Sequence, residues 1–185
     1  MSRVIVFLAD GFEETEALCP VDVLRRAGIE VVLAGVGSDM ITSSHGVTVK
    51  ADTTVESVDS SEHFAVAFCP GGMPGSVNLS QSWNVNEIIV KTAQTGIVAA
   101  ICAAPAVVLA PLGLLKGRNA TCFPGCESYA PDMVFSGEGI VVDGNIVTAK
   151  SAGWAFDLGL KLVSMLKGSD EAEKVRSAIY YKESL

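Results

Sequence analysis

Short, wholly apolar segments alternate along this chain with segments that have the spacing of amphipathic helices. Three segments are apolar throughout, namely Val4–Ala9, Phe64–Cys69 and Ile97–Ile101, and helical stretches such as Glu16–Ala27 lie between them. A strand that is apolar on both faces must be covered on both faces, which is the situation in a parallel sheet between two layers of helices. The alternation therefore predicts a doubly wound α/β domain, a three-layer sandwich with a mostly parallel sheet.

The remaining elements are predicted from spacing and from turn residues. Gly28 follows the first helix at a position where a left-handed backbone conformation costs glycine little. Asp143-Gly144 is a typical residue pair of a two-residue hairpin turn. We expect further strands at Glu30–Ala34, Thr121–Phe123, Ile140–Val142 and Asn145–Ala149, a small hairpin of Met40–Thr42 and Val47–Lys50, and helices that begin near Asn84 with Glu87 as a capping partner, directly after Cys102, at Trp154–Leu166 and at Glu171–Tyr181.

Length and hydrophobic content indicate a single domain. The chain has 185 residues, of which 49% are hydrophobic, and this is enough for one well-buried core. No linker, repeat or low-complexity tract divides the sequence. We therefore expect one domain over residues 1–185.

Charge and cysteine usage narrow the partners and the compartment. The net charge of −8 argues against nucleic-acid binding, because phosphate contacts need clustered Lys and Arg. No apolar stretch approaches membrane-spanning length, and the first strand leads into Asp10 and glutamates rather than a signal-peptide cleavage site. Five cysteines without a C-x-x-C pair fit a reducing compartment. We expect a cytoplasmic protein whose partners are small molecules or proteins, with no nucleic acid and no membrane.

Cys102 lies where a predicted buried strand turns directly into a predicted helix. Such a turn presents its side chain at the edge of the sheet, and the free N–H groups of the new helix favour negative charge there. The sequence therefore predicts a thiol with increased thiolate character, as in a nucleophile or a redox sensor. The alternative interpretation is an inert core residue, because cysteine is among the most buried residue types.

Three segments with polar or reactive residues follow predicted strands. They are Asp10–Glu16, Gly71–Gly75 and Cys102-Ala103. Ligands of doubly wound folds bind outside the carboxyl ends of the strands, so we expect these segments to converge there. Within the first of them, Glu13 and Glu14 are interpreted as charges that complement the dipole of the following helix.

Glu16 and Gly71-Gly72 could supply the groups that a reactive cysteine needs. Beneath a thiolate, Glu16 would not ionise easily, because two neighbouring anions raise each other's proton affinity. A proton shared by Cys102 and Glu16 resolves the conflict, and the two groups are expected to titrate as a pair. Gly71-Gly72 could present backbone N–H groups to an oxyanion, or could form an ordinary turn.

The other four cysteines are interpreted as structural. Cys69 ends a core strand and Cys19 lies in the first helix. Cys122 and Cys126 lack a metal-ligand pattern, because no histidine follows them. We expect no metal site and no organic cofactor, since the chain has neither a P-loop nor a dinucleotide-binding fingerprint.

A family resemblance rests on motifs that occur in order along nearly the whole chain. They are Ala9-Asp10-Gly11-Phe12-Glu13-Glu14-Thr15-Glu16, Pro20-Val21-Asp22-Val23, Arg25-Arg26-Ala27-Gly28, Pro70-Gly71-Gly72 and Ala100-Ile101-Cys102-Ala103-Ala104-Pro105. Together they resemble the ThiJ/PfpI superfamily, and most closely its bacterial branch related to the Parkinson-disease protein DJ-1. The resemblance implies a flavodoxin-like sandwich that forms a homodimer.

The resemblance also implies roles for individual residues. Cys102 would be the nucleophile and Glu16 its protonated partner, with an oxyanion pocket made by the backbone amides of Gly72 and Ala103. By the same resemblance, a substrate or anion pocket near the cysteine would include His45, Gly71, Phe123 and, from the partner subunit, Arg26. From their residue types alone, Arg26 would be a charge at a helix C-terminus and His45 a solvated hairpin residue.

The activity implied is that of a glutathione-independent glyoxalase or protein deglycase, acting on methylglyoxal, glyoxal or their protein adducts. Animal relatives carry a histidine where this chain has Phe123, so either the activity is slow or Glu16 does all the proton transfer. Ala103 replaces the histidine of the protease branch, and the late histidine of glutamine amidotransferases is absent. The alternatives are an oxidative-stress sensor or redox-regulated chaperone acting through a Cys102 sulfinate, and an interaction protein indifferent to Cys102.

Overall fold

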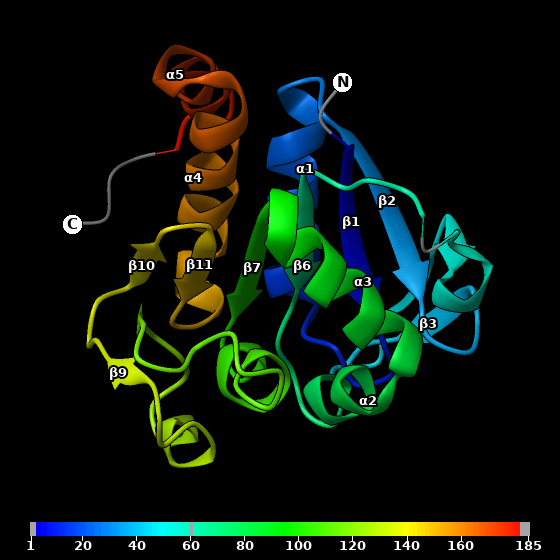
Figure 1. Ribbon diagram of the computed structural model, residues 1–185. Coiled ribbons are helices and arrows are strands. Elements are labelled where there is room, and N and C mark those ends of the chain that lie inside the picture. Colours follow the sequence, from blue (N-terminus) through cyan, green and yellow to red (C-terminus); the bar gives the residue numbers. More distant parts are fainter. Residues whose placement is uncertain (1–2, 60, 182–185) are drawn as a thin grey trace.

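A seven-stranded sheet forms the centre of the molecule (Figure 1). The computed structural model describes residues 3–59 and 61–181. The strand order is β10-β11-β7-β6-β1-β2-β5, and every neighbouring pair is parallel except β10 with β11. The strands are β1 (Arg3–Leu8), β2 (Glu30–Gly35), β5 (Thr53–Thr54), β6 (Val66–Cys69), β7 (Ile97–Ile101), β10 (Ile140–Asp143) and β11 (Ile146–Ala149).

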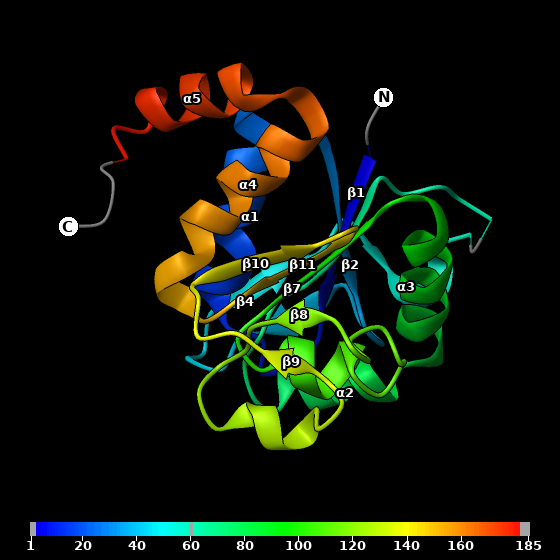
Figure 2. The same cartoon turned by 60° about the vertical axis from the view of Figure 1, so that its left-hand side comes forward.

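Helices cover both faces of this sheet, as Figure 2 shows with the sheet seen nearly edge-on. The helices α1 and α4 lie on one face, and α2 and α3 lie on the other. Two small sheets pair β3 with β4 and β8 with β9. The bounds are α1 (Glu14–Arg26), α2 (Gly75–Gln81), α3 (Trp83–Thr95), α4 (Ala155–Lys167), α5 (Ser169–Ala178), β3 (Met40–Thr42), β4 (Thr48–Lys50), β8 (Asn119–Ala120) and β9 (Val134–Phe135), with single turns η1 (Val55–Ser57), η2 (Pro105–Leu109), η3 (Cys126–Tyr129) and η4 (Ala152–Trp154).

The two faces of the sheet explain why the central strands are apolar throughout. Along β1, Val4 and Val6 belong to the core cluster that includes Leu24 of α1, whereas Ile5 belongs to the cluster that includes Ile89 of α3. Successive side chains of a strand point to opposite faces, so a strand between two helical layers needs apolar residues at every position. This confirms the predicted doubly wound, flavodoxin-like architecture.

The chain adds strands first on one side of β1 and then on the other, so the strand order changes direction between β1 and β6. After β1 it adds β2 and β5 on one side, and then β6, β7 and β11 on the other. The loops that follow β1 and β6 therefore leave the carboxyl edge in opposite directions, which opens a place for a ligand.

Several local predictions differ from the structure. The helix α3 begins at Trp83, next to the predicted start near Asn84, but Glu87 is not its capping partner, because the Ser82 hydroxyl accepts the Val85 N–H at 3.4 Å and so supplies the cap. The short strand predicted over Thr121–Phe123 is wrong, since β8 ends at Ala120. The predicted hairpin is confirmed by the antiparallel pairing of β10 and β11, but its two-residue turn is Gly144-Asn145, one residue later than predicted, because Asp143 pairs with Ile146 as the last residue of β10.

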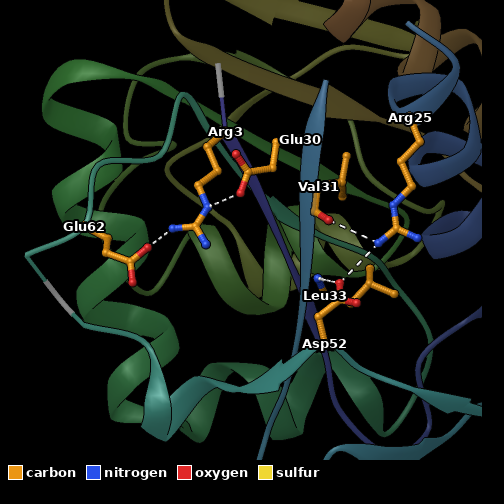
Figure 3. A network of polar contacts seen from close by, with 7 residues as sticks. All are labelled: Arg3, Arg25, Glu30, Val31, Leu33, Asp52 and Glu62. Atoms are coloured by element: carbon orange, nitrogen blue, oxygen red, sulfur yellow. Dashed lines mark hydrogen bonds and ion pairs between the residues drawn. The ribbon is translucent and has the colours of Figure 1, made fainter. Parts of the chain in front are cut away.

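Charged side chains link β1 and β2 to the segments around them (Figure 3). Arg3 at the start of β1 pairs with Glu30 of β2 at 2.9 Å and with Glu62. Arg25 of α1 contacts the Asp52 carboxylate at 3.1 Å. These pairs are partly exposed, so each contributes little to stability. No helix in the described part of the chain has the length and apolar character needed to cross a lipid bilayer.

Candidate active site

Cys102 follows β7 in a left-handed backbone conformation, with φ of 64°. Residues other than glycine adopt this conformation at a cost, and it persists where the surroundings fix it. Here the Cys102 N–H donates to the Ala149 carbonyl at 2.9 Å, and the Cys102 carbonyl accepts the Phe123 N–H at 2.7 Å. This left-handed turn at Cys102, which we call the elbow, therefore holds the half-buried thiol at the carboxyl edge of the sheet.

Glu16 lies in the first turn of α1 and is 1% exposed. Its Oε2 accepts the Gly71 N–H at 3.1 Å, and its carboxyl group is hydrogen-bonded to the Cys102 thiol and to the backbone of Ala152. Burial raises the pKa of Glu16 to about 7, and the nearby charge of Glu13 acts in the same direction. This carboxyl group can therefore both hold and release a proton near neutral pH.

The prediction of an acidic Cys102 thiol is wrong for the resting structure. Burial raises the pKa of Cys102 to about 12, with the charge of Glu16 as the second cause, while hydrogen bonds from the backbone N–H groups of Ala103 and Gly72 act against the rise. A helical segment does start directly after Cys102, since the Val107 N–H donates to the Ala103 carbonyl at 2.9 Å, but the N–H groups at its start do not outweigh the effect of burial on the thiol. The first proton thus leaves the Cys102–Glu16 pair near pH 7, and the hydrogen bond shares the remaining one.

Two glycines let the loop after β6 approach this pair. A Cβ atom at Gly71 would collide with the Glu16 carboxylate and lie 2.6 Å from the Cys102 Cβ. A Cβ atom at Gly72, whose φ is 95°, would lie 2.6 Å from the carbonyl carbon of Phe12. Only glycine fits at either position, and the Gly72 N–H consequently reaches the thiol together with the Ala103 N–H.

The structure thus brings together the three segments whose convergence was predicted. A thiol, a buried carboxyl group and two backbone N–H donors meet at one point of the carboxyl edge. Such a group can supply a nucleophile, a proton carrier and donors for a developing oxyanion. Phe123 lies beside the elbow through its backbone bond to Cys102, and 46% of the residue is exposed.

His45 and Arg26, which were predicted for the pocket near Cys102, have other side chains as partners. The His45 Nδ1 lies 3.1 Å from the Glu14 Oε2, and the hydrogen bond that the Glu14 carboxylate accepts in this exposed ion pair raises the pKa of His45. Arg26 is in the last turn of α1, ten residues after Glu16 and so about 15 Å along the helix, where its Nε contacts Asp22 at 2.7 Å. Within one chain, Arg26 does not join the site.

One group of side chains has ligand atoms close enough together to hold a metal ion. Within residues 3–59 and 61–181, it consists of Glu13, Glu14 and His45, whose ligand atoms all lie within 4.8 Å of one another. These atoms already have partners, because Glu13 accepts the Glu16 N–H and Glu14 pairs with His45. Sequence reasoning did not find this grouping, since nothing local to the hairpin indicates that it folds against the start of α1.

The other four cysteines are buried or half-buried. Cys69 and Cys122 are buried, Cys19 and Cys126 are half-buried, and burial raises the pKa of all four thiols. Their environments agree with the structural role inferred from the sequence.

Comparison with known proteins identifies the family. The model of the DJ-1/PfpI family matches residues 2–165. The Parkinson disease protein 7 homolog of Danio rerio is 36% identical over 186 residues, which cover 98% of this chain and 98% of that protein. A protein of Pyrococcus abyssi that is named a deglycase is 33% identical over 171 residues, covering 89% of this chain and 99% of that protein.

Solved structures give the same result. A DJ-1 superfamily protein from Salmonella typhimurium, crystallised as a cysteine-to-alanine mutant, matches with a TM-score of 0.94 and 33% identity over 99% of this chain and 100% of its own. The oxidized DJ-1 of Toxoplasma gondii matches with a TM-score of 0.93 and 35% identity, with the same coverage. The chain therefore belongs to the DJ-1/PfpI family.

Proposed function

We propose that this protein is a cysteine-dependent, cofactor-independent enzyme that converts methylglyoxal or glyoxal, or their protein adducts, to 2-hydroxy acids. The observation that carries the proposal is the hydrogen-bonded pair of Cys102 and Glu16 beneath two backbone N–H donors. The relative from Pyrococcus abyssi that is named a deglycase supports the same class of reaction.

The reaction begins when the Cys102 sulfur attacks the aldehyde carbon. A C–S bond forms, and the carbonyl electron pair moves to oxygen, giving a hemithioacetal oxyanion. The N–H groups of Gly72 and Ala103, which already bond to the sulfur, stabilise that charge from close by. The thiol proton passes to Glu16, so the nucleophile becomes a thiolate only as the substrate arrives.

Glu16 then carries the proton that the isomerisation requires. It first gives the thiol proton to the hemithioacetal oxygen and so becomes a carboxylate again. This carboxylate removes the proton from the former aldehyde carbon and returns it to the neighbouring carbon through an enediol, while the hydroxyl proton moves from the first oxygen to the second, which leaves a thioester on Cys102. Water breaks the thioester C–S bond, releasing the 2-hydroxy acid and regenerating the thiol. A carboxyl group whose pKa is raised to about 7 is suited to both halves of this transfer at neutral pH.

A homodimer is part of the proposal. Arg26 lies too far from Glu16 to serve the site of its own chain, so its implied role requires a second copy to bring it there. Light scattering of the purified protein tests this arrangement, and a monomer would remove Arg26 from the substrate pocket.

The second candidate function is an oxidative-stress sensor or redox-regulated chaperone. The protonated Glu16 and the two N–H donors could equally bond the oxygens of a Cys102 sulfinate, which forms when a thiolate reacts with two equivalents of peroxide. The Toxoplasma gondii relative was crystallised in an oxidized form. In this case turnover of a dicarbonyl would be insignificant.

The test is lactate formation from methylglyoxal by the wild type, Cys102→Ser and the control variant Cys69→Ala. We expect turnover by the wild type and the control, and a loss of about 10³-fold or more in Cys102→Ser. Lactate formation at the wild-type rate by Cys102→Ser would refute the enzyme mechanism. Absence of turnover in the wild type, together with selective addition of two oxygens to Cys102 by peroxide, would establish the sensor instead.

A further inference from the structure

Glu13 immediately precedes α1 and lies one helical turn before Glu16. Its backbone is extended, with φ of −91° and ψ of 120°, as is usual for the residue that caps a helix. Its Oε2 accepts the Glu16 N–H at 2.6 Å. The side chain of Glu13 therefore fixes the backbone of the residue whose carboxyl group meets Cys102.

A second hydrogen bond joins Glu13 to the glycine loop. The Glu13 N–H donates to the Gly71 carbonyl at 2.9 Å, and the Gly71 N–H donates to the Glu16 Oε2 at 3.1 Å. The three residues thus form a closed circuit of hydrogen bonds. It places the acid and the start of the loop that carries the Gly72 N–H at fixed positions relative to each other.

The backbone of the Gly71–Gly72 loop packs closely against the start of α1. A Cβ atom at Gly72 would press on the Glu13 backbone nitrogen, and it would lie 2.5 Å from the Gly11 carbonyl oxygen. Loop and helix start are therefore in direct backbone contact. A change in the position of Glu13 would move both the proton carrier and an oxyanion donor.

The charge of Glu13 acts on the same acid. Two ionisable groups face Glu16, namely Cys102 and Glu13, and Glu13 in turn lies beside the ion pair of Glu14 and His45. A carboxylate close to Glu16 disfavours a second negative charge and so favours the protonated form of Glu16. The effect is opposed where His45 is protonated, because that charge lies next to Glu13.

We propose that Glu13 is a positioning residue that holds Glu16 and the Gly71–Gly72 loop in register and whose charge favours the protonated form of Glu16. This assigns Glu13 a purpose beyond complementing the helix dipole. The inference rests on the proposed function only for the use made of that proton, because its test needs no turnover.

The experiment measures the rate of Cys102 alkylation by iodoacetamide as a function of pH. The neutral variants are Glu13→Gln and Glu13→Ser, the latter having a good helix-capping side chain if the former folds poorly. Glu13→Asp keeps both charge and cap, and Glu14→Gln is the matched control, since Glu14 lies outside the circuit. Each Glu13 variant is also made in a Glu16→Gln background, and circular dichroism and thermal unfolding show whether each protein is folded.

We expect the wild-type rate to pass through an inflection near pH 7 that belongs to Glu16. In the neutral Glu13 variants it should move to lower pH by about half a unit or more, the direction given by removing a like charge. Glu13→Asp should restore the wild-type position, and Glu14→Gln should move it much less than the neutral Glu13 variants do, because Glu14 acts on Glu16 only through its ion pair with His45. In the Glu16→Gln background, neutralising Glu13 should have no effect on the profile.

An unmoved inflection in a folded neutral variant would overturn the inference, as would an equal shift in Glu14→Gln. Absence of any inflection in the wild type would also overturn it, because Glu13 would then have no proton to control. Loss of lactate formation in the wild type with the expected shifts intact would reject the proposed function and leave the role of Glu13 standing.

Discussion

Cys69 and Cys102 both lie at the carboxyl edge of the sheet, at the ends of the neighbouring parallel strands β6 and β7. Cys69 is the last residue of β6 and pairs in register with Ala100 of β7. Both thiols are free. Position at the carboxyl end of a central parallel strand is therefore common to the two residues, and it does not account for their different environments.

The surroundings of the two thiols account for the difference. Cys69 continues its strand into the core, where it is fully buried, and burial alone raises the pKa of its thiol. Cys102 instead leaves its strand in a left-handed turn and meets the Glu16 carboxyl group and the Gly72 and Ala103 N–H groups. Reactivity at this edge therefore comes from the elbow together with Glu16 and the Gly71-Gly72 loop, and not from the strand end itself.

The largest expected difference between the two cysteines is in oxidation by peroxide. Cys102 should gain two oxygens at least about 100-fold faster than Cys69, because oxidation of a fully buried thiol requires local unfolding of the core. Peptide mass spectrometry of the native protein after a peroxide time course measures both rates. Comparable rates would show that the elbow confers no selectivity.

Gly71→Ala should displace Glu16 and the groups around Cys102, because the added methyl group meets them and not Cys69. The added methyl group would collide with Glu16 and lie 2.9 Å from the Ile101 carbonyl oxygen. We expect methylglyoxal turnover to fall by about 10²-fold, since small displacements of positioning groups have effects of this size. Steady-state kinetics with thermal unfolding measures the result, and wild-type turnover in this variant would contradict the proposed contact.

Glu16→Gln should change the way in which the free energy of unfolding depends on pH, because the substitution acts at Cys102 and not at Cys69. The folded pKa of Glu16 is about 7 against an ordinary value of 4.5, so the native state binds more protons than the unfolded state between these values. The free energy of unfolding should therefore fall by up to about 3 kcal/mol as pH rises from 4.5 to 7. Urea unfolding at pH 5 and pH 8 should show this fall in the wild type and a much smaller one in Glu16→Gln. Equal falls in both proteins would argue against a protonated Glu16.

Phe123→His should have the smallest effect. If Glu16 performs the proton transfers alone, a histidine at this half-exposed position changes turnover by less than about threefold, because the mechanism has no step left for it. The measurement is the pH profile of kcat/KM. An increase of tenfold or more would show that proton transfer limits the wild type.

Much of the fold was predictable from local patterns. The apolar strands and the hairpin around Gly144 follow from residue type, because burial on both faces and a tight turn each demand particular side chains, although the turn lies one residue later than predicted. The short helix α2 was missed, since it is only seven residues long and rests on packing rather than on a strong helical pattern. The cap at Ser82 was missed because Asn84 and Glu87 offered a competing capping box.

The position of the site in the fold was predictable from the sequence. The pKa of its cysteine was not. The convergence of Glu16, Gly71-Gly72 and Cys102 follows from the rule that ligands bind at the carboxyl edge. The raised pKa of Cys102 was not predicted, because the sequence does not reveal how deeply a turn is buried. The circuit through Glu13 was likewise hidden, since its bond to Gly71 joins residues that are distant in sequence.

The pH dependence of alkylation in the wild type and in Glu16→Gln tests the pairing of Cys102 with Glu16 most directly. Peptide mapping should show Cys102 reacting first among the five cysteines, with an inflection near pH 7 that Glu16→Gln removes. Superimposable profiles for the two proteins, or a Cys102 that does not react until the protein unfolds, would contradict the account.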